Sequence, residues 1–389
     1  MADPARTTRS ASARTKTTTR STRSRSSDSG SAKSAQRRPK MDEARRQRLT
    51  DYYTQMLLIR RFEERAQRAY TEALIGGYCH LNLGEEAAIV GLLGEMSPGD
   101  YLFTNYREHG YAITRGIDPR KVMAELYGRV DGVSKGWGGS MHMFDVTHRL
   151  LGGYGIVGGQ LPIATGAALA LQYQDRPEIV VCTMGDGTTA TGAFHESVNL
   201  AGLWDLPIVY VIINNGLGMG TDVEHSSAEP ELYKRGAAYR IESARVDGLD
   251  AEKTAAAAKR AVEVARGGRP YLLEIMTERL RGHSVVDPAK YRSAEEVAEL
   301  KQRDPVHTFA DELKKEGVLD DDALAKIEAD VMAIVDDAAS FAASSPQPDA
   351  STLFDYTYAT PVPNDSRRYP GQPLYPALPV PALITGGAA

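Results

Sequence analysis

The stretch EIVVCTMGDGTTATGAFHESVNLAGLWDLPIVYVIINNG, residues 178–216, decides the fold class. Its two apolar runs, 178–184 and 206–214, are rich in Val and Ile and have the length of strands that are buried on both faces. The segment between them, 192–204, has the length and composition of a helix. Strand, helix and strand in this order form the unit from which parallel sheets are built, so the stretch predicts an α/β fold.

A second unit of the same kind follows along the chain. RIESARVDG (240–248) and PYLLEIM (270–276) predict two more strands, and the Ala-rich segment 250–268 predicts a helix that ends on a glycine pair. We therefore expect a doubly wound parallel sheet with flanking helices. Nearer the N-terminus, residues 41–74 carry apolar side chains at steps of three and four, which predicts a helix with one face packed on this body.

The overall composition is that of an ordinary globular protein. The chain has 389 residues, of which 42% are apolar and 25% charged. Its apolar segments are shorter than the roughly 18 residues of a membrane span, and the N-terminus lacks the apolar centre of a secretory signal. Two cysteines, Cys79 and Cys182, are too few for a disulfide framework or a structural zinc site. These features predict a cytoplasmic protein that makes no membrane contact.

The two ends of the chain differ from the body in composition. Residues 1–40 contain eleven Lys or Arg and two Asp, a formal charge of +9, whereas the rest of the chain carries −14. This arm lacks Leu, Ile, Val and aromatic residues, so we expect it to be disordered, as a solvated tail or a tether to an acidic partner, and not a nucleic-acid binder. Residues 41–345 then form the α/β domain, and the Pro-rich residues 346–389 form an extended tail.

Polar residues follow two of the predicted strands at the edge of the sheet where ligands bind. Asp186 lies between two glycines directly after the first strand, and Asn214 and Asn215 end the next one. Glycines let backbone N–H groups approach an anion, and carboxylate and amide oxygens suit Mg²⁺ bound to a diphosphate. Each motif alone is more typical of a turn. Because both end neighbouring predicted strands, the sequence predicts a metal-diphosphate site.

Gly153, Gly155 and Gly158 have the spacing G-x-G-x-x-G of a dinucleotide-binding loop. Such a loop requires a strand that leads into the first glycine and a helix whose N-terminus points at the pyrophosphate. The preceding residues, GSMHMFDVTHRLL, contain two His, an Asp and an Arg, and we expect no strand there. A nicotinamide or flavin site is therefore disfavoured, and the glycines need another explanation.

A G-D-G motif followed by a pair of asparagines, here with Asn215 placed 29 residues after Asp186, is the signature of thiamine-diphosphate enzymes. Outward from this pair, the chain resembles the α subunits of the pyruvate dehydrogenase decarboxylating component, in the thiamine-diphosphate-dependent 2-oxo acid dehydrogenase family. The similarity spans about residues 50–310. The matching segments are YCHLNLGEEAAIVG (78–91), NYREHGYAITRG (105–116), AELYGR (124–129), KGWGGSMHM (135–143), GIVGGQLP (155–162) and RGHSVVDPAKYRS (281–293).

The resemblance implies thiamine diphosphate and Mg²⁺ as cofactors. The loop at Gly155 and Val157 would bind the aminopyrimidine ring through its backbone, which explains why glycines stand there. An Arg suits the diphosphate because its planar fork donates two hydrogen bonds to phosphate oxygens. The diphosphate contacts that the resemblance implies are Tyr106, Arg107, Gly187, Thr188 and Arg279.

The metal ligands and the catalytic histidines also follow from the resemblance. The carboxylate of Asp186, the side chain of Asn215 and the backbone carbonyl of Leu217 would bind Mg²⁺. Many relatives carry an aromatic residue in place of Leu217, but a backbone contact should survive the change. His80 and His283 would lie near the thiazolium ring and the substrate, with His283 also beside the cofactor, where they could orient a 2-oxo acid or transfer protons.

The implied activity is oxidative decarboxylation of pyruvate with reductive acetylation of a lipoyl group, which feeds acetyl-CoA synthesis. In this family the glutamate that activates the cofactor comes from a separate β subunit, and we assign that role to no residue of this chain. The resemblance therefore implies an assembly of two α and two β chains, with a lipoyl acyltransferase as the next partner.

Three alternatives remain open from the sequence. Acetoin or a branched-chain 2-oxo acid could replace pyruvate as the substrate of the same machinery. A non-catalytic scaffold subunit could keep the fold without the chemistry. Asp186, Asn215, Arg107 and His283 are all present, which argues against the scaffold, because a chain freed from catalysis need not retain the four together.

Overall fold

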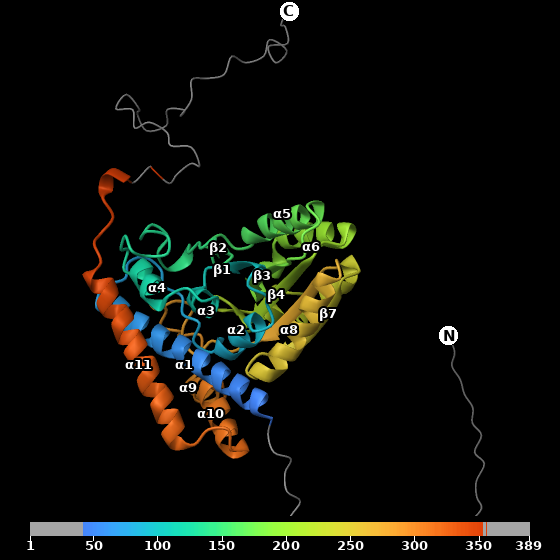
Figure 1. Ribbon diagram of the computed structural model, residues 1–389. Coiled ribbons are helices and arrows are strands. Elements are labelled where there is room, and N and C mark those ends of the chain that lie inside the picture. The colour runs from blue at the N-terminus through green and yellow to red at the C-terminus, as the bar shows by residue number, and fades with distance from the viewer. Residues whose placement is uncertain (1–41, 353–354, 356–389) are drawn as a thin grey trace, which may run out of the picture. The chain divides into compact units, whose positions relative to one another are not determined.

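The computed structural model describes residues 42–352 and 355, so the predicted arm at 1–40 and most of the predicted tail at 346–389 lie outside the described residues. The described residues form a parallel sheet with helices packed on both of its faces (Figure 1). The prediction of a doubly wound α/β fold is thereby confirmed.

The main sheet has six parallel strands in the order β2-β1-β3-β4-β8-β7. The strands are β1 Tyr101–Asn105, β2 Leu150–Tyr154, β3 Val180–Gly185, β4 Ile208–Asn214, β7 Glu242–Asp247 and β8 Tyr271–Met276. The four predicted strands are β3, β4, β7 and β8, and the two that the sequence did not indicate are β1 and β2. All seven residues of β4 are buried, and each large aliphatic side chain buried in this way contributes about 1.5–3 kcal/mol.

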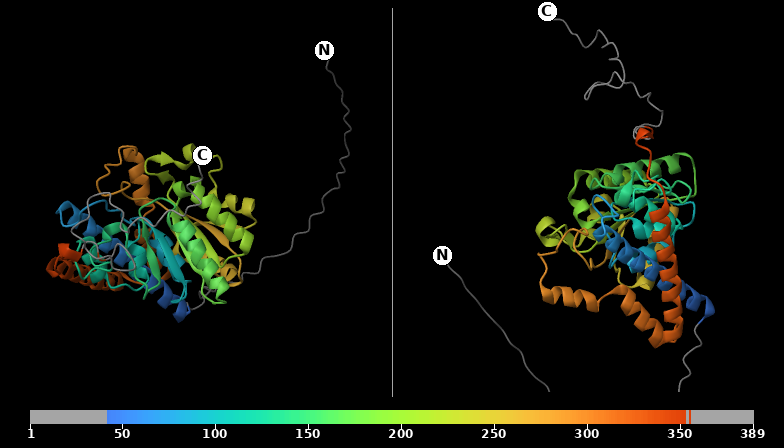
Figure 2. Two further views of the ribbon diagram at one scale, coloured as in Figure 1. Left: turned by 90° about the horizontal axis from the view of Figure 1, so that it is seen from above. Right: turned by 90° about the vertical axis from the view of Figure 1, so that its left-hand side faces the viewer.

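Helices cover both faces of the sheet (Figure 2). One face packs against α5 (Gln160–Tyr173) and α6 (Gly192–Trp204), and the other packs against α8 (Ala251–Arg266), with α2 (Glu86–Leu93) beside it. The helix α6 has the predicted bounds because the side chain of Thr191 accepts a hydrogen bond from the N–H of the third helical residue and so caps its first turn.

The long helix α1 (Glu43–Thr71) fulfils the prediction of an N-terminal helix and packs against α2, α10 and α11. Among the described residues, no helix is both long enough and apolar enough to span a bilayer. The remaining elements are α3 His109–Thr114, α4 Pro119–Leu126, η1 Gly139–Met141, η2 Asp186–Ala190, β5 Leu217–Gly218, β6 Thr221–Asp222, α7 Val223–Ser226, η3 Leu232–Tyr239, α9 Ala294–Gln302, α10 Pro305–Glu316, α11 Asp321–Ser344 and η4 Ala350–Thr352.

The strand β2 shows that the expectation of no strand before the glycines was wrong. It leads directly into Gly155, and α5 begins five residues later at Gln160, so strand, glycine turn and helix are all present. The sequence of β2, LLGGY, contains two glycines and no β-branched residue, and the strand forms because it pairs with β1 at the edge of the sheet. The presence of this strand removes the argument against a dinucleotide site. The ligand has to be inferred from the residues that line the binding cavity described below.

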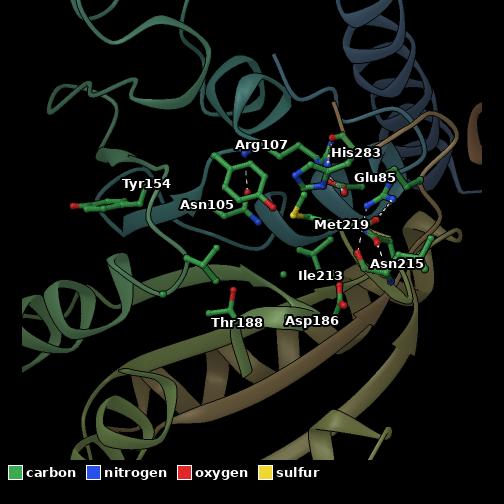
Figure 3. A pocket seen from close by; sticks show the side chains of 18 of the residues that line it. Glu85, Asn105, Arg107, Tyr154, Asp186, Thr188, Ile213, Asn215, Met219 and His283 are labelled. Carbon is green, nitrogen blue, oxygen red and sulfur yellow. Dashed lines mark hydrogen bonds and ion pairs between the residues drawn. The ribbon is translucent and has the colours of Figure 1, made fainter. Parts of the chain in front are cut away.

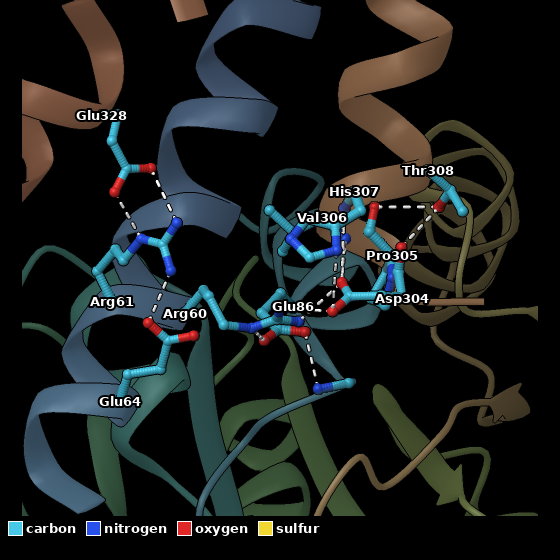
Figure 4. Close-up of polar contacts among 11 residues, drawn as sticks. Arg60, Arg61, Glu64, Glu86, Asp304, Pro305, Val306, His307, Thr308 and Glu328 are labelled. Carbon is cyan, nitrogen blue, oxygen red and sulfur yellow. Dashed lines mark hydrogen bonds and ion pairs between the residues drawn. The ribbon is translucent and has the colours of Figure 1, made fainter. Parts of the chain in front are cut away.

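A buried ion-pair network joins α1 to α2 and α10 (Figure 4). Arg60 Nε donates to a carboxylate oxygen of Glu86 at 2.7 Å, and the two Nη atoms donate to the carboxylate of Asp304 at 2.7 and 3.0 Å. All three side chains are buried, and Asp304 also caps α10. The network thereby fixes the far end of the segment 277–304, which starts at the carboxyl edge of the sheet and contributes to the site described next.

Candidate active site

A cavity of about 230 Å³ lies at the carboxyl edge of the sheet, where the turns after β1, β2, β3, β4 and β8 meet (Figure 3). Parallel strands place these ends on one side, which is where open α/β sheets bind ligands. The predicted residues that line the cavity are Tyr106, Arg107, Val157, Asp186, Gly187, Thr188, Asn215, Leu217, Arg279 and His283. The other two predicted residues, Gly155 and His80, adjoin lining residues.

Asp186 stands at the end of β3 with one carboxylate oxygen unsatisfied. The residue is 5% exposed, and its Oδ2 atom has no hydrogen-bond partner within the described part of the chain. Burial raises the pKa of Asp186 to about 6, although a backbone N–H and the nearby Arg279 act in the opposite direction. A buried carboxylate oxygen without a partner is unfavourable unless a cation or a proton binds it.

The two turns after β3 and β4 are in contact. A Cβ atom built on Gly187 would lie 3.7 Å from the Cα of Gly218, and one built on Gly218 would lie 3.9 Å from Oδ2 of Asp186. Because β3 and β4 are paired in register up to Gly185 and Ile213, their turns leave the sheet side by side. The turns that carry Asp186 and Asn215 therefore lie side by side, as predicted.

The adjacent asparagines Asn214 and Asn215 make different contacts. Asn214 Nδ2 donates to a carboxylate oxygen of the buried Glu274 at 2.6 Å, and its Oδ1 accepts from the N–H of Gly216 at 2.9 Å. Asn215 lines the cavity, and its Oδ1 accepts a longer bond of 3.3 Å from the N–H of Leu217. Asn214 therefore shapes the turn, whereas Asn215 presents its amide to the cavity.

These groups fit a divalent cation that also binds an anionic ligand. No three His, Cys, Asp or Glu side chains gather as a metal-binding cluster in the described residues, so the protein alone offers few charged ligands. Asp186 and Asn215 provide oxygen donors of the type that Mg²⁺ prefers, and Mg²⁺ commonly takes its other ligands from phosphates and water. The carbonyl of Leu217, the third predicted ligand, accepts a hydrogen bond from Arg279 Nη1 at 3.3 Å.

Two aromatic rings of the cavity wall, Tyr106 and His283, pack against the ring of His80 behind them. The ring of His80 lies 4.5 Å from that of Tyr106 and 4.9 Å from that of His283, measured between centroids. Burial and the positive charge of Arg107 lower the pKa of His80 to about 3 and that of His283 to about 4. The Nδ1 atoms of both rings are buried without a partner within residues 42–352. Both imidazoles are therefore neutral at physiological pH and have a free hydrogen-bonding position.

The low pKa of His80 predicts a pH dependence of stability. Because its pKa is about 3 in the folded protein and 6.5 ordinarily, the folded state binds fewer protons than the unfolded state between these values. The free energy of unfolding should therefore fall as the pH decreases from 6.5 to 4. The slope of the unfolding free energy against pH measures how many more protons the unfolded state binds than the folded state. In His80→Gln, we expect this difference to be smaller by up to about one proton, measured by urea denaturation at several pH values. The wild type is the reference, and an unchanged slope in His80→Gln would contradict the assignment.

Two arginines reach the cavity, and each also connects two segments of the chain. Arg107 donates to the carbonyl oxygens of Leu81 and His283, which belong to the two segments that carry the histidines. Arg279 donates to the carbonyl of Met219 at 2.6 Å, and its Nε is buried without a partner in the described residues. A guanidinium has five N–H groups, so both side chains keep donors for phosphate oxygens.

Gly155 and Val157 form the turn between β2 and α5. Val157 is 49% exposed and lines the mouth of the cavity. A Cβ on Gly155 would lie 3.1 Å from the ring of His142, so a larger residue would push the turn away from that support. His109, in contrast, is fully buried and bonds the carboxylate of Glu63 through Nδ1 at 2.9 Å. His142 bonds the carbonyl of Gly153 through Nδ1 at 3.1 Å, so His109 and His142 both support the fold.

Three polar residues of the cavity had no predicted role, namely Glu85, Asn105 and Gln160. Glu85 lies within the segment GEEA and Asn105 within NYREHG, and both segments belong to the resemblance. Gln160 begins α5, and its side chain donates to the carbonyl of Thr183 at 2.9 Å. A charged residue directly before an apolar helix is common, so the sequence offered no signal that separates Glu85 from an ordinary helix start.

Comparison with known proteins agrees with this geometry. Residues 54–351 match the family described as dehydrogenase E1 component. The chain is 45% identical over 304 residues to the pyruvate dehydrogenase E1 component subunit alpha of Rhizobium meliloti, covering 78% of this chain and 87% of that protein. It is 44% identical over 319 residues to the protein of the same name from Zymomonas mobilis, covering 81% and 90%. A testis-specific mitochondrial form from Homo sapiens is 41% identical over 312 residues, covering 79% of each chain.

Proposed function

Because the chain belongs to the dehydrogenase E1 component family, we propose that it is the α subunit of a pyruvate dehydrogenase decarboxylating component. The reaction is the thiamine-diphosphate-dependent oxidative decarboxylation of pyruvate, with transfer of the acetyl group to a lipoyl group for acetyl-CoA synthesis. The observation that carries the proposal is a carboxylate oxygen of Asp186 that has no partner among residues 42–352. It lies beside the turn of Asn215 in a cavity with two arginines and a neutral histidine.

The residues of the cavity fit the diphosphate half of a thiamine-diphosphate site. Asp186 and Asn215 would hold Mg²⁺, and Arg107 and Arg279 would bind diphosphate oxygens through their free N–H groups. When bound, thiamine diphosphate supplies a carbon nucleophile for the ketone of the substrate and accepts the electron pair released with CO₂.

His80 and His283 supply proton-carrying groups for this chemistry. A neutral imidazole donates from one ring nitrogen and accepts at the other, so each ring can bind a carboxylate or ketone oxygen of a 2-oxo acid and pass on a proton. Tyr106 packs against both rings, with centroid distances of 4.5 and 5.8 Å, and so limits their movement. The rings therefore orient the substrate without placing a charge in the cavity.

Exposed apolar side chains on the α5–α6 side of the sheet support a protein partner. They lie on α5, on α6 and on the turn before α5, and their exposed fractions range from 39% to 90%: Ile156, Val157, Ile163, Leu169, Tyr173, Leu203 and Trp204. Apolar groups gathered on one face indicate an interaction surface. We propose that a β subunit covers this face and supplies the glutamate that the cofactor requires, in an assembly of two α and two β chains that acts on a lipoyl acyltransferase.

The proposal is tested by measuring decarboxylation with thiamine diphosphate, Mg²⁺ and an artificial electron acceptor. The chain is assayed with and without its β subunit on pyruvate, acetoin and 2-oxoisovalerate. We expect turnover of pyruvate only when the β subunit is present, because the chain alone holds one half of the site. Preference for acetoin or 2-oxoisovalerate would replace pyruvate with that substrate. Absence of both turnover and cofactor binding would favour a scaffold subunit. A cytoplasmic location stays a prediction.

A further inference from the structure

The cavity contains a second carboxylate that the proposed chemistry does not use. Of the described residues that line the cavity, Glu85 and Asp186 are the two with a carboxylate side chain. Glu85 is 4% exposed and lies on the same side of the cavity as Arg107 and His283, away from Asp186 (Figure 3). A buried carboxylate near an anion site opposes anion binding, so its presence requires an explanation.

The position of Glu85 before α2 does not provide that explanation. It is the N-cap residue of α2, yet its side chain makes no capping hydrogen bond in the structure. The following residue, Glu86, does not line the cavity and pairs with Arg60 in the buried network that joins α1 and α10 (Figure 4). Of these two adjacent glutamates, Glu86 therefore belongs to the buried Arg60 network and Glu85 faces the cavity.

Glu85 is held in place by two contacts. Its Oε1 atom lies 3.4 Å from Nε of Arg107, and its Oε2 atom accepts a hydrogen bond of 2.9 Å from Nδ2 of Asn82. Asn82 is itself fixed, because its N–H donates to Glu63 and its Oδ1 accepts from the N–H of Gly110, both at 2.9 Å. Burial raises the pKa of Glu85, whereas Arg107 and Asn82 oppose that shift by stabilising the carboxylate.

Arg107 is the group through which Glu85 can influence the site. Besides the carboxylate, its guanidinium binds the carbonyl oxygens of Leu81 and His283, so it connects the two segments that carry His80 and His283. Glu85 contacts the Nε side of the guanidinium, while the carbonyl oxygens bind its two Nη atoms. An anion that enters the cavity must share this cation with Glu85.

We propose that Glu85 is a positioning residue. It fixes Arg107 in contact with the two segments that carry His80 and His283, and it lowers the affinity of the cavity for diphosphate. This inference rests on the proposed function, because it assumes that the cavity receives a diphosphate. Its physical basis is that Glu85 neutralises a positive charge which would otherwise attract the anion, and charges separated by a few ångströms in a buried site interact strongly.

The test compares Glu85→Gln with the wild type in binding inorganic diphosphate in the presence of Mg²⁺, by titration calorimetry on the enzyme assembled with its β subunit. Gln removes the charge but keeps an oxygen that can accept from Arg107. We expect the variant to bind diphosphate about tenfold more tightly. In the enzyme assembled with its β subunit, we expect KM for thiamine diphosphate and kcat for pyruvate to fall together, because Arg107 binds the anion better and fixes the histidine segments less well.

Controls separate this inference from a structural role and from the proposed function. Glu86→Gln removes a buried charge one residue away and should lower Tm without changing diphosphate affinity. Glu85→Ala should share the gain in affinity, so the inference is overturned if neither Glu85 variant binds more tightly, or if both are unfolded at 25 °C by circular dichroism. If the wild type binds no diphosphate with Mg²⁺, the proposed cofactor site and the inference are both overturned. If only the gain is missing, the cofactor site stands.

Discussion

Asp186→Asn should abolish Mg²⁺-dependent binding of thiamine diphosphate and lower pyruvate turnover of the assembled enzyme by about 10²–10³-fold or more. The amide has the shape of the carboxylate but lacks its charge, and Mg²⁺ then loses the one anionic ligand that the turn after β3 provides. The carboxylate is buried, and its Oδ2 has no partner within the described residues, so its removal should leave Tm unchanged or raise it. Loss of activity without loss of stability is the expected signature of a residue that serves the ligand.

Asp100→Asn is a matched control for this variant. Asp100 is buried as well, but it lies before β1, at the opposite edge of the sheet, where it accepts from the N–H of Ile179 and pairs with Arg266. Its replacement should lower Tm and leave the cofactor affinity of the folded protein unchanged. The account of Asp186 would be contradicted if both variants bound thiamine diphosphate equally well, as measured by calorimetry over a range of Mg²⁺ concentrations.

Arg60→Leu should lower the free energy of unfolding by about 3–5 kcal/mol. Leu removes the cation between Glu86 and Asp304 and leaves two carboxylates buried without their partner, which costs more than the loss of the pair itself. Because Asp304 ends the segment 277–304 and caps α10, we also expect this segment to become more accessible to proteases. Urea denaturation measures the first effect and limited proteolysis the second.

The neighbouring residue on the same helix provides the control for Arg60. Arg61 pairs with Glu328 and Glu64 at distances of 2.7 Å, but its side chain is 27% exposed and those of its partners 38% and 39% (Figure 4). Exposed pairs of this kind contribute roughly 0–1 kcal/mol, so Arg61→Leu should destabilise the protein by no more than that. Equal destabilisation by the two changes would show that the buried network has no special role in the fold.

The centre of the sheet was predictable because its strands carry their own signal. The Val- and Ile-rich runs of β3 and β4 are buried on both faces and stand on either side of a helix that has the predicted bounds. The strands β1 and β2 have five residues each, YLFTN and LLGGY, and lack such runs. Their structure depends on pairing with the rest of the sheet, which local sequence does not contain.

Most residues of the site could be predicted from the sequence, whereas Glu85, Asn105, Gln160 and the contacts among the site residues could not. The strand ends at Asp186 and Asn215 could be placed together, since parallel strands bring their carboxyl ends to one edge. Which of the two asparagines faces the cavity depends on Glu274, a buried residue of β8 that binds Asn214 from the neighbouring strand. The contact between Glu85 and Arg107 likewise joins residues that are separated in the chain and that no local pattern connects.

The central claim is that the cavity at the end of β3 holds a diphosphate through a divalent cation. It is tested most directly by a crystal structure of the chain with its β subunit, thiamine diphosphate and Mn²⁺ in place of Mg²⁺, with the metal located by its anomalous signal. We predict a single peak within coordination distance of the Asp186 carboxylate and the Asn215 amide oxygen, with the diphosphate beside Arg107. A metal peak elsewhere, or a diphosphate bound away from Asp186, would contradict the account.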